Sequence, residues 1–403
     1  MPFFDYVVIQ KSGKEKKGSI EAGNEETAKR ILKEEGYLPI SIVPQSTMNK
    51  DINFKIGSGV KPRELATFCK QFETILGAGV TVINALEMLS EEIDNKILKN
   101  AIQNVQLNVE KGETLAGAMR LQGKVFPTIL IDMIAAGEAS GSLDNSFGRM
   151  SNHFTKENRL KAIIAKAMVY PCILLMVIIG VVAVMMIKIV PQFMESFEQL
   201  DAELPAITLA VIGVSNVLKD RWWVIVLLAI GTFFTIRQLK KTRTGALFFG
   251  RLELKIPLLG NLTIKTASAR FTRTLSTLLG AGISLIDAVD IVGRTMSNAI
   301  IKKVMEEAKE DVMRGVPLSK PLEASGVFPA MVYHMTKIGE ETGNMEEMLD
   351  QISNYYDEEV EIATEALTAA MEPMIIVVMA VLVVPIILAI MMPMMSIYSA
   401  AGV

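Results

Sequence analysis

The chain contains two related copies of one segment, and the copies lie about two hundred residues apart. The sequence FCKQFETILGAGVTVINALEML, which starts at Phe68, matches FTRTLSTLLGAGISLIDAVDIV, which starts at Phe271. Further along, FPTILIDMIAAGEASGSL from Phe126 matches FPAMVYHMTKIGEETGNM from Phe328. An internal repeat of this kind means that one structural unit is built twice. Any fold of this chain must therefore contain two similar modules in the same order.

Each module is followed by an apolar segment long enough to cross a membrane. Ala167 to Ile187 carries no charged residue, and neither does the chain from Pro373 onward, whose core runs from about Met374 to Met392. A transmembrane helix needs ~20 apolar residues. Half of the 403 residues are hydrophobic and the mean hydropathy is +0.36, yet 21% are charged. This composition indicates a membrane protein with large water-facing parts, and the net charge of −3 argues against nucleic-acid binding.

A shorter apolar segment, Trp222 to Ile236, is predicted to form a third span. It covers about 22 Å as a helix, less than a hydrocarbon core of ~30 Å, but local thinning of the bilayer permits a crossing. If both modules lie in the cytoplasm and both end in an outgoing helix, a return crossing between them is required. The flanking residues agree with this arrangement. The basic residues on the cytoplasmic side are Lys156, Arg159, Lys161, Lys166, Arg237, Lys240, Lys241 and Arg243, whereas Val190 to Asp220 is acidic.

The same charge distribution predicts that the N-terminus is cytoplasmic and the C-terminus lies outside. The first residues lack the basic-then-apolar order of a signal peptide, as this orientation requires. The apolar stretch Leu204 to Leu218 falls in the outer loop. A fourth crossing there would put the modules on opposite sides of the membrane. We therefore expect either a helix on the outer membrane surface or an ordinary helix of the loop.

The predicted fold is that of an all-α membrane protein with two repeated cytoplasmic helical bundles, three transmembrane helices and a small N-terminal α/β appendage. Apolar residues recur at helical spacing in both modules, with no alternating strand pattern. The first residues differ, because short strand-like segments flank a helical one. The predicted parts are a ββαβ appendage (1–45), a linker (46–62), module 1 (63–166), span 1 (167–190), an outer loop with a surface helix (191–221), span 2 (222–236), module 2 (237–369), span 3 (370–395) and an outer tail (396–403).

Two glycine-containing motifs mark turns in each module. The first is G-A-G, which ends one helix before Thr81 or Ser284 begins the next as N-cap. The second is G-E-x-[ST]-G, where glycines permit a tight reversal and Ser142 or Asn344 is placed to cap the following long helix. The predicted turn residues are Gly77, Gly79, Gly137, Gly141, Gly280, Gly282, Gly339 and Gly343.

Charged residues near these motifs have two interpretations. Glu138 and Glu340 either form local hydrogen bonds inside a helix–turn–helix or contact a partner protein. The acidic run that follows is either a solvated helix start or a surface for a basic partner or a divalent cation. Basic residues at equivalent positions of the first helices either belong to an opposing polar face or are solvated. The candidate partner contacts are Glu138, Glu340, Glu341, Glu346, Glu347, Lys70 and Arg273.

The sequence indicates no catalytic, cofactor or metal site. Cys69 and Cys172 lie in different environments, and His153 and His334 are the only histidines. The chain contains no G-x-x-x-x-G-K-[ST], H-E-x-x-H or G-x-S-x-G motif. We therefore expect a protein that is not an enzyme and has no cofactor.

The duplicated module, the repeated G-A-G turn, the F-P and G-E-x-[ST]-G motifs and the three spans resemble the inner-membrane platform proteins of type IV pilus and type II secretion machines, the PilC/GspF family. The resemblance covers essentially the whole chain. It implies an oligomeric, non-catalytic protein of the bacterial inner membrane that couples a cytoplasmic hexameric ATPase to pilin movement and fibre assembly. Its implied partners are that ATPase, pilin or pseudopilin, other inner-membrane assembly components and the lipid bilayer, with no nucleic acid.

Within the family we favour the pilus version over the type II secretion or competence-pseudopilus version. A membrane transporter is a more remote alternative, suggested by repeats combined with spans. It is disfavoured because no charged residue lies deep in a predicted span, where ion-coupled transporters usually keep functional charges.

Overall fold

A computed structural model describes residues 3–9, 15–21, 25–34, 38–44, 60–198 and 205–400. The chain divides into two compact units, Met1–Ser58 and Gly59–Val403. The first unit contains β1 (Phe3–Ile9), β2 (Glu15–Glu21), α1 (Glu25–Glu34) and β3 (Leu38–Pro44). Both outer strands pair antiparallel with β1, so the sheet order is β2-β1-β3. The predicted linker lies largely outside the described residues.

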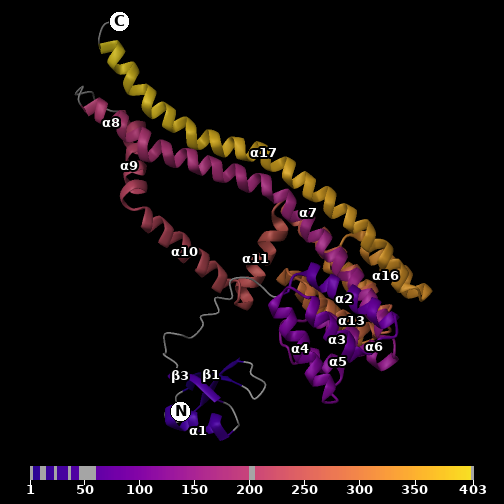
Figure 1. Ribbon diagram of the computed structural model, residues 1–403. Helices are drawn as coiled ribbons and strands as arrows, with labels where there is room; N and C mark the ends of the chain where they lie inside the picture. The colour runs from indigo at the N-terminus through magenta and orange to yellow at the C-terminus, as the bar shows by residue number, and fades with distance from the viewer. Residues whose placement is uncertain are drawn as a thin grey trace. The chain divides into compact units, whose positions relative to one another are not determined.

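Module 1 is a bundle of short helices, as the helical periodicity predicts (Figure 1). Its core contains a cluster of phenylalanines in which Phe68 contacts Phe72, Phe126 and Phe147. Thr81 caps α3 by accepting a hydrogen bond from the backbone N–H of Asn84 at 3.4 Å, which confirms the predicted N-cap. The helices are α2 (Pro62–Gly77), α3 (Val82–Glu92), α4 (Lys96–Glu110), α5 (Leu115–Arg120) and α6 (Thr128–Ser140).

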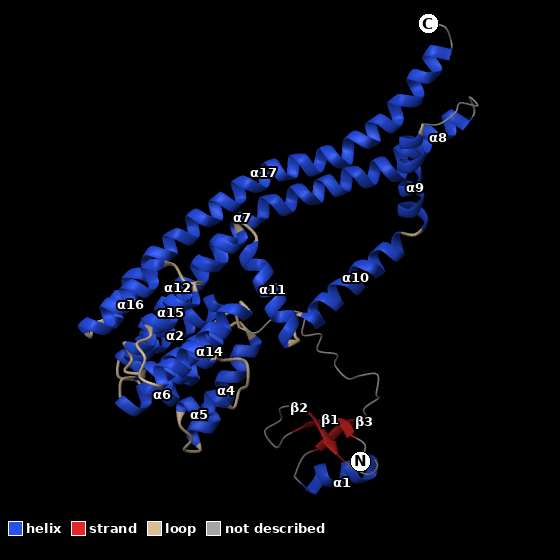
Figure 2. Ribbon diagram, turned by 180° about the vertical axis from the view of Figure 1, so that it is seen from behind, coloured by secondary structure: helices blue, strands red, loops and turns tan. Residues whose placement is uncertain are grey.

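Module 2 repeats this arrangement, and its helices lie beside those of module 1 (Figure 2). The two modules share one core. Phe271 and Phe328 pack with ring centroids 5.1 Å apart, and Ser284 caps α13 as Thr81 caps α3. The buried apolar residues of both modules form one continuous cluster. The two copies are therefore halves of a single packed body. The helices are α11 (Arg243–Lys255), α12 (Leu259–Leu279), α13 (Leu285–Thr295), α14 (Ala299–Met313), α15 (Ser319–Ser325) and α16 (Ala330–Thr342).

Each module continues into one very long helix. These helices are α7 (Leu143–Val184), which continues through the π-helical turn η1 (Met185–Ile189) into α8 (Val190–Glu198), and α17 (Met345–Ala400). Figures 1 and 2 show α7 and α17 side by side along much of their length. Both are long and apolar enough to cross a membrane. The third apolar helix, α10 (Trp222–Leu239), has 18 residues and falls short of the length and composition of these two.

The apolar stretch between the first two apolar helices forms helix α9 (Ala206–Asp220), which packs against η1 and the distal part of α17. Two buried hydroxyls on one face of α9 bond to backbone carbonyls of the long helices. Ser215 Oγ donates to Met186 O at 2.5 Å, and Thr208 Oγ1 donates to Ala389 O at 3.0 Å. The expected loop helix therefore connects both copies of the repeat.

The two acceptor carbonyls are those that proline leaves without a helical partner. In α17, the N–H that would pair with Ala389 O belongs to position 393, which is proline. In η1 the bonds shift to the π register, shown by the Val190 N–H bonding to Met185 O. In the same register, Met186 O would accept a hydrogen bond from the backbone nitrogen of residue 191. That residue is proline, whose nitrogen has no hydrogen. Equivalent prolines of the two repeats thus create two acceptors, and α9 supplies both donors.

We expect Ser215→Ala combined with Thr208→Val to lower the stability of the membrane-inserted protein by about 1–2 kcal/mol, because two apolar-buried carbonyls lose their donors. The measurement is the apparent Tm in lipid nanodiscs. Thr235→Val is the matched control, since Thr235 Oγ1 donates at 2.8 Å to Gly231 O of its own helix, at an exposed position. Equal Tm shifts in the control and the double variant would contradict a role for α9 in joining the helices.

Candidate functional site

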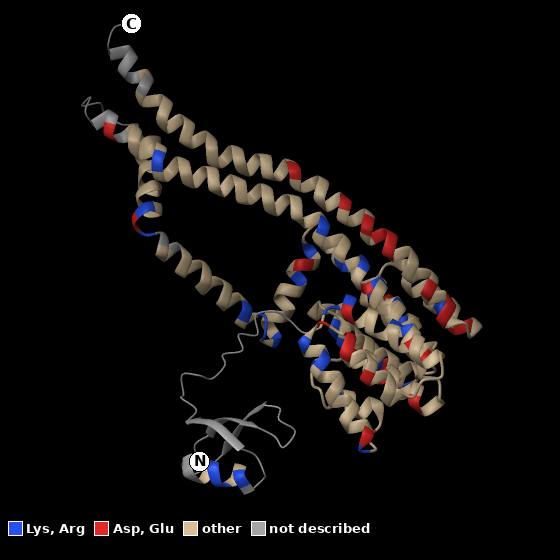
Figure 3. Ribbon diagram, viewed as in Figure 1, with Lys and Arg blue, Asp and Glu red and all other residues tan. Residues whose placement is uncertain are grey.

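A series of ion pairs connects the two modules along their long helices. The basic partners on α7 face acidic partners on α17, and Figure 3 shows these opposite charges along the adjacent segments. Arg149 lies 2.8 Å from Glu346, and Lys156 Nζ donates to Asn354 at 2.8 Å. Further pairs between α7, α12 and α17 are Lys156–Asp350 (3.4 Å), Arg159–Glu361 (3.7 Å), Arg270–Glu157 (4.0 Å) and Lys265–Glu359 (2.5 Å), besides the buried pair described below.

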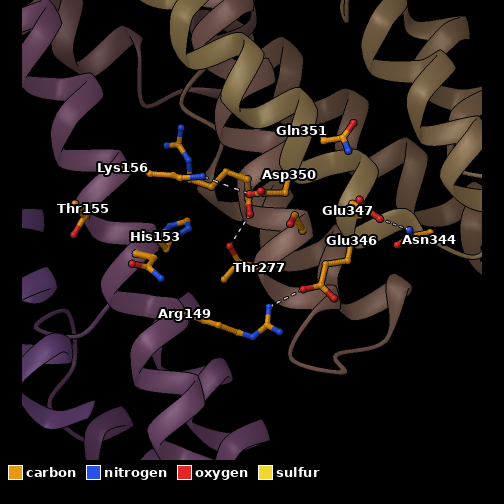
Figure 4. A pocket seen from close by; sticks show the side chains of 13 residues that line it. Arg149, His153, Thr155, Lys156, Thr277, Asn344, Glu346, Glu347, Asp350 and Gln351 are labelled. Carbon is orange, nitrogen blue, oxygen red and sulfur yellow. Dashed lines mark hydrogen bonds and ion pairs between the residues drawn. The ribbon is translucent and has the colours of Figure 1, made fainter. Parts of the chain in front are cut away.

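An open cleft of about 850 Å³ lies between these helices, and we call it the inter-module cleft (Figure 4). One wall comes from α7 and is basic, with Arg149 and Lys156. The opposite wall comes from the first turns of α17 and is acidic, with Glu346, Glu347 and Asp350. Such a cleft can recognise charged side chains of a partner protein through either wall.

A buried ion pair forms part of the contact between α12 and α17. Arg273 Nη2 donates to Asp357 Oδ1, and the side chains are only 5% and 17% exposed. Burial raises the pKa of the Asp357 carboxyl above its ordinary value, and Arg273 opposes this shift. At the equivalent position of module 1, Lys70 is 66% exposed and bonds to Glu73 at 2.8 Å. The two candidate basic residues therefore differ, because Arg273 is occupied inside the protein and Lys70 faces solvent.

His153 is a buried histidine close to this pair. Burial lowers its pKa to about 4, although Glu157, 4.0 Å away, acts in the opposite direction. Burial therefore favours the neutral form of the imidazole. Within the described ranges, no three His, Cys, Asp or Glu side chains come together as metal ligands.

Glu138 and Glu340 cap short helices inside their own modules. Glu138 accepts from the backbone N–H groups of Leu115 (2.6 Å) and Ala116 (2.9 Å), the first residues of α5. Glu340 accepts from the N–H of Leu318, the N–H of Ser319 (3.3 Å) and the hydroxyl of Ser319 (2.6 Å), where α15 begins. A carboxylate at a helix N-terminus satisfies donors that the helix leaves free. Both observations favour the structural interpretation over partner contact.

Two of the eight predicted turn glycines do not lie in turns. Gly137 and Gly339 are inside α6 and α16, where each helix passes very close to the start of the next. A Cβ at Gly137 would lie 2.4 Å from Ser146 Oγ, and one at Gly339 would lie 2.8 Å from Met345 Cα. The prediction was wrong for these two because α6 and α16 continue to Ser140 and Thr342, so the reversal begins later than the motif suggests.

The other glycines lie at helix ends. Gly141 and Gly343 end α6 and α16 with φ of 72° and 74°, in the left-handed region that favours glycine. The G-A-G motif places Gly79 and Gly282 in the same region, while Gly77 and Gly280 are the last residue of α2 and the C-cap of α12. Ser142 occupies the N-cap position of α7 without a capping bond from its side chain, because its hydroxyl pairs with that of Ser140 at 2.7 Å.

Three acidic candidates remain accessible on module 2. Glu341 is exposed, with Lys337 3.9 Å away, and Glu346 is about half exposed beside Arg149. Glu347 accepts from the Asn344 side chain at 2.5 Å and lines the inter-module cleft. The sequence alone did not identify Lys156, Asp350 or Asp357 as members of the ion pairs between the helices. Lys156 and Asp350 meet where α7 lies against α17, whereas Asp357 meets Arg273 where α12 packs against α17, and no local motif signals either contact.

The duplicated helical module, the single shared core and the two helices of spanning length define a class of protein. It is a membrane protein built from an internal repeat. Residues 68–191 and 271–393 match the family described as Type II secretion system (T2SS), protein F. Residues 1–43 match the N-terminal domain of the same family. The chain belongs to the type II secretion system protein F family and, with its two apolar helices, is an inner-membrane protein.

Individual relatives match over nearly the whole chain. Type IV pilus assembly protein PilC of Pseudomonas aeruginosa is 36% identical over 378 residues, which cover 93% of this chain and 99% of that protein. The protein of the same name from Thermus thermophilus is 35% identical over 408 residues, covering 100% of both chains. Type II secretion system protein F of Aeromonas hydrophila is 29% identical over 374 residues, with 91% and 95% covered.

Proposed function

We propose that this chain is the inner-membrane platform protein of a type IV pilus machine. In this role it transmits the motion of a cytoplasmic hexameric ATPase to pilin subunits during fibre assembly. The observation that supports the pilus version is the pattern of identity among relatives. Three proteins named PilC are 36%, 35% and 32% identical to this chain and the pilus assembly protein TapC is 29% identical, whereas four named type II secretion system protein F are 27–30% identical. A type II secretion platform is the second candidate, because those relatives also match nearly full length.

In the proposed topology α7, α10 and α17 cross the membrane, and both modules lie in the cytoplasm. Two parallel repeats that each end in an outgoing helix need a return crossing, and α10 is the apolar helix between them. Its 18 residues reach about 27 Å, close to the hydrocarbon thickness. Helix α9 then lies on the outer side. The boundaries proposed for the cytoplasmic modules remain 63–166 and 237–369.

The proposed contact with the ATPase involves the accessible acidic residues Glu341, Glu346 and Glu347. Glu346 and Glu347 line the inter-module cleft, Glu341 lies exposed near the C-terminal end of α16, and the negative charge of all three suits a basic partner. Lys70 is a second, exposed candidate on module 1. Glu138, Glu340 and Arg273 already have internal partners, so their contribution to a partner contact is indirect.

The test is photo-crosslinking in cells from a crosslinker placed at Glu341, with Val217 of α9 as the matched control on the opposite side of the membrane. We expect position 341 to capture a secretion-type ATPase, identified by mass spectrometry, and position 217 to capture none. Pilin-like proteins should co-purify with the protein. Capture of the ATPase from position 217, or from neither position in folded protein, would contradict the proposal. Pseudopilins in place of pilins would assign the chain to type II secretion.

A further inference from the structure

Helix α11 lies between the end of α10 and the part of α7 that precedes its apolar run. It begins directly after α10, with Thr242 as N-cap, and its C-terminal part shares a small cavity with Ile164 of α7. Ile164 precedes the first apolar run by three residues. Figures 1 and 2 show α11 running from the end of α10 towards α7. Both ends of α11 therefore lie where membrane-spanning segments meet the cytoplasm.

One face of α11 is fixed to module 2. Asn298 Nδ2 donates to Gly250 O and to Glu253 Oε2, both at 3.1 Å. Thr263 Oγ1 donates to Glu253 Oε1 at 3.1 Å, and Leu254 packs against the core. A Cβ at Gly250 would lie 3.0 Å from the Asn298 side chain, so this contact is close. The helix is thus held in a defined orientation about its axis.

The other face of α11 and the loop after it expose large apolar side chains. Phe248 is 65% exposed and Leu252, one turn further on, is 46% exposed. The loop continues with exposed Ile256, Leu258 and Leu259. Leu258 has a φ of 69°, a conformation that costs a non-glycine residue of order 1–2 kcal/mol. The fold therefore holds an apolar side chain at the surface against its backbone preference.

Basic residues surround these apolar side chains. From Arg237 to Lys255 the chain has one acidic residue, Glu253, and its carboxylate is already occupied by Asn298 and Thr263. Figure 3 shows Lys and Arg at both ends of α11. The basic residues of this segment are Arg237, Lys240, Lys241, Arg243, Arg251 and Lys255. Exposed apolar residues combined with basic ones are typical of helices that lie in the headgroup region of a membrane.

We propose that α11 and the α11–α12 loop bind anionic phospholipids of the cytoplasmic leaflet. Phe248, Leu252 and Leu258 enter the boundary between headgroups and acyl chains, while Arg251 and Lys255 contact lipid phosphates. The proposal rests on the crossing of α10 within the proposed function. Because α11 is fixed to module 2, this contact holds module 2 at a defined tilt relative to the membrane.

The test uses the full-length chain in lipid nanodiscs, with Cys172 changed to alanine and Cys69 left buried. An environment-sensitive fluorophore is attached at Leu252→Cys, and nitroxide quenchers are placed at a shallow acyl position. In bilayers containing phosphatidylglycerol we expect about threefold stronger quenching at 252 than at Met313→Cys. Met313 is an exposed residue at the opposite end of α14 from Asn298. Leu228→Cys with a deep quencher reports separately on the crossing of α10.

Charge dependence distinguishes headgroup binding from simple apolar contact. Arg251→Glu with Lys255→Glu should reduce quenching at 252 about threefold, as should replacing phosphatidylglycerol by phosphatidylcholine. The matched control, Arg314→Glu with Lys320→Glu, makes the same charge change near Met313 and should have no effect. Quenching at 228 but not at 252, or equal quenching in both lipids, would overturn the lipid proposal and leave the topology intact. Absence of deep quenching at 228 would overturn both.

Discussion

Arg273→Met is expected to destabilise the protein by about 3–5 kcal/mol, because it leaves the buried Asp357 carboxylate without its partner. The side chain of Arg273 is only 5% exposed and donates directly to Asp357, in the contact between α12 and α17. Methionine preserves much of the volume and removes the charge. The measurement is the free energy of unfolding of the detergent-solubilised protein, with Lys70→Met as the matched control at the equivalent, exposed position of module 1.

The pH dependence of this loss identifies its cause. Burial already raises the pKa of Asp357, and removal of Arg273 takes away the interaction that opposes the rise. In the variant, the folded state then binds the proton more tightly than the unfolded state, so stability falls as pH increases through the raised pKa. The loss should therefore be largest near pH 8 and smaller near pH 5. Arg273→Met combined with Asp357→Leu should recover much of the stability, and a pH-independent loss would contradict the explanation.

Glu340→Ala is expected to cost at least about 3 kcal/mol, because it removes three hydrogen bonds to a charged acceptor and such bonds contribute about 1.5–3 kcal/mol each. Its carboxylate accepts from two backbone N–H groups and one hydroxyl at the start of α15. The readout is hydrogen exchange at Leu318 and Ser319 together with the Tm. Glu138→Ala should have a similar effect at the start of α5, where Glu138 accepts two N–H groups.

Glu341→Ala is the matched control for this prediction, since Glu341 is exposed and 3.9 Å from Lys337. It should change the Tm little and exchange at α15 not at all. The comparison also separates stability from partner binding, because Glu341 is a proposed contact and Glu340 an internal cap. Fast exchange at α15 in both variants, or in neither, would contradict the assignment.

The sequence predicts the short-range structure well, where a local motif determines it. Thr81 and Ser284 follow a glycine turn and precede an apolar helix, so their role as N-caps depends on neighbours within a few residues. Gly141 and Gly343 are likewise identified by the helix ends that they form. The duplication predicts that both modules have the same fold, and it predicts family membership.

The contacts between the repeats were not predictable in the same way. Whether Arg273 is buried and Lys70 exposed depends on which helix packs against each, and the two positions look equivalent in an alignment of the repeats. The capping role of Glu138 joins residues more than twenty positions apart, across α5 and α6. The hydroxyls of α9 pair with carbonyls whose identity depends on a π-helical shift before Pro191. Each of these needs the tertiary arrangement of the helices.

The unbroken course of α17 has a mechanical consequence. Its 56 residues extend about 84 Å, more than twice the thickness of a bilayer's hydrocarbon core. Its base belongs to a helical body with a single core, so that body and the base of the helix move together. A rotation of the body by about 7° would displace the far end of such a lever arm by about 10 Å, roughly one helix diameter. In the proposed topology, small angular steps of the body would thus become displacements of about a helix diameter at the far end of α17.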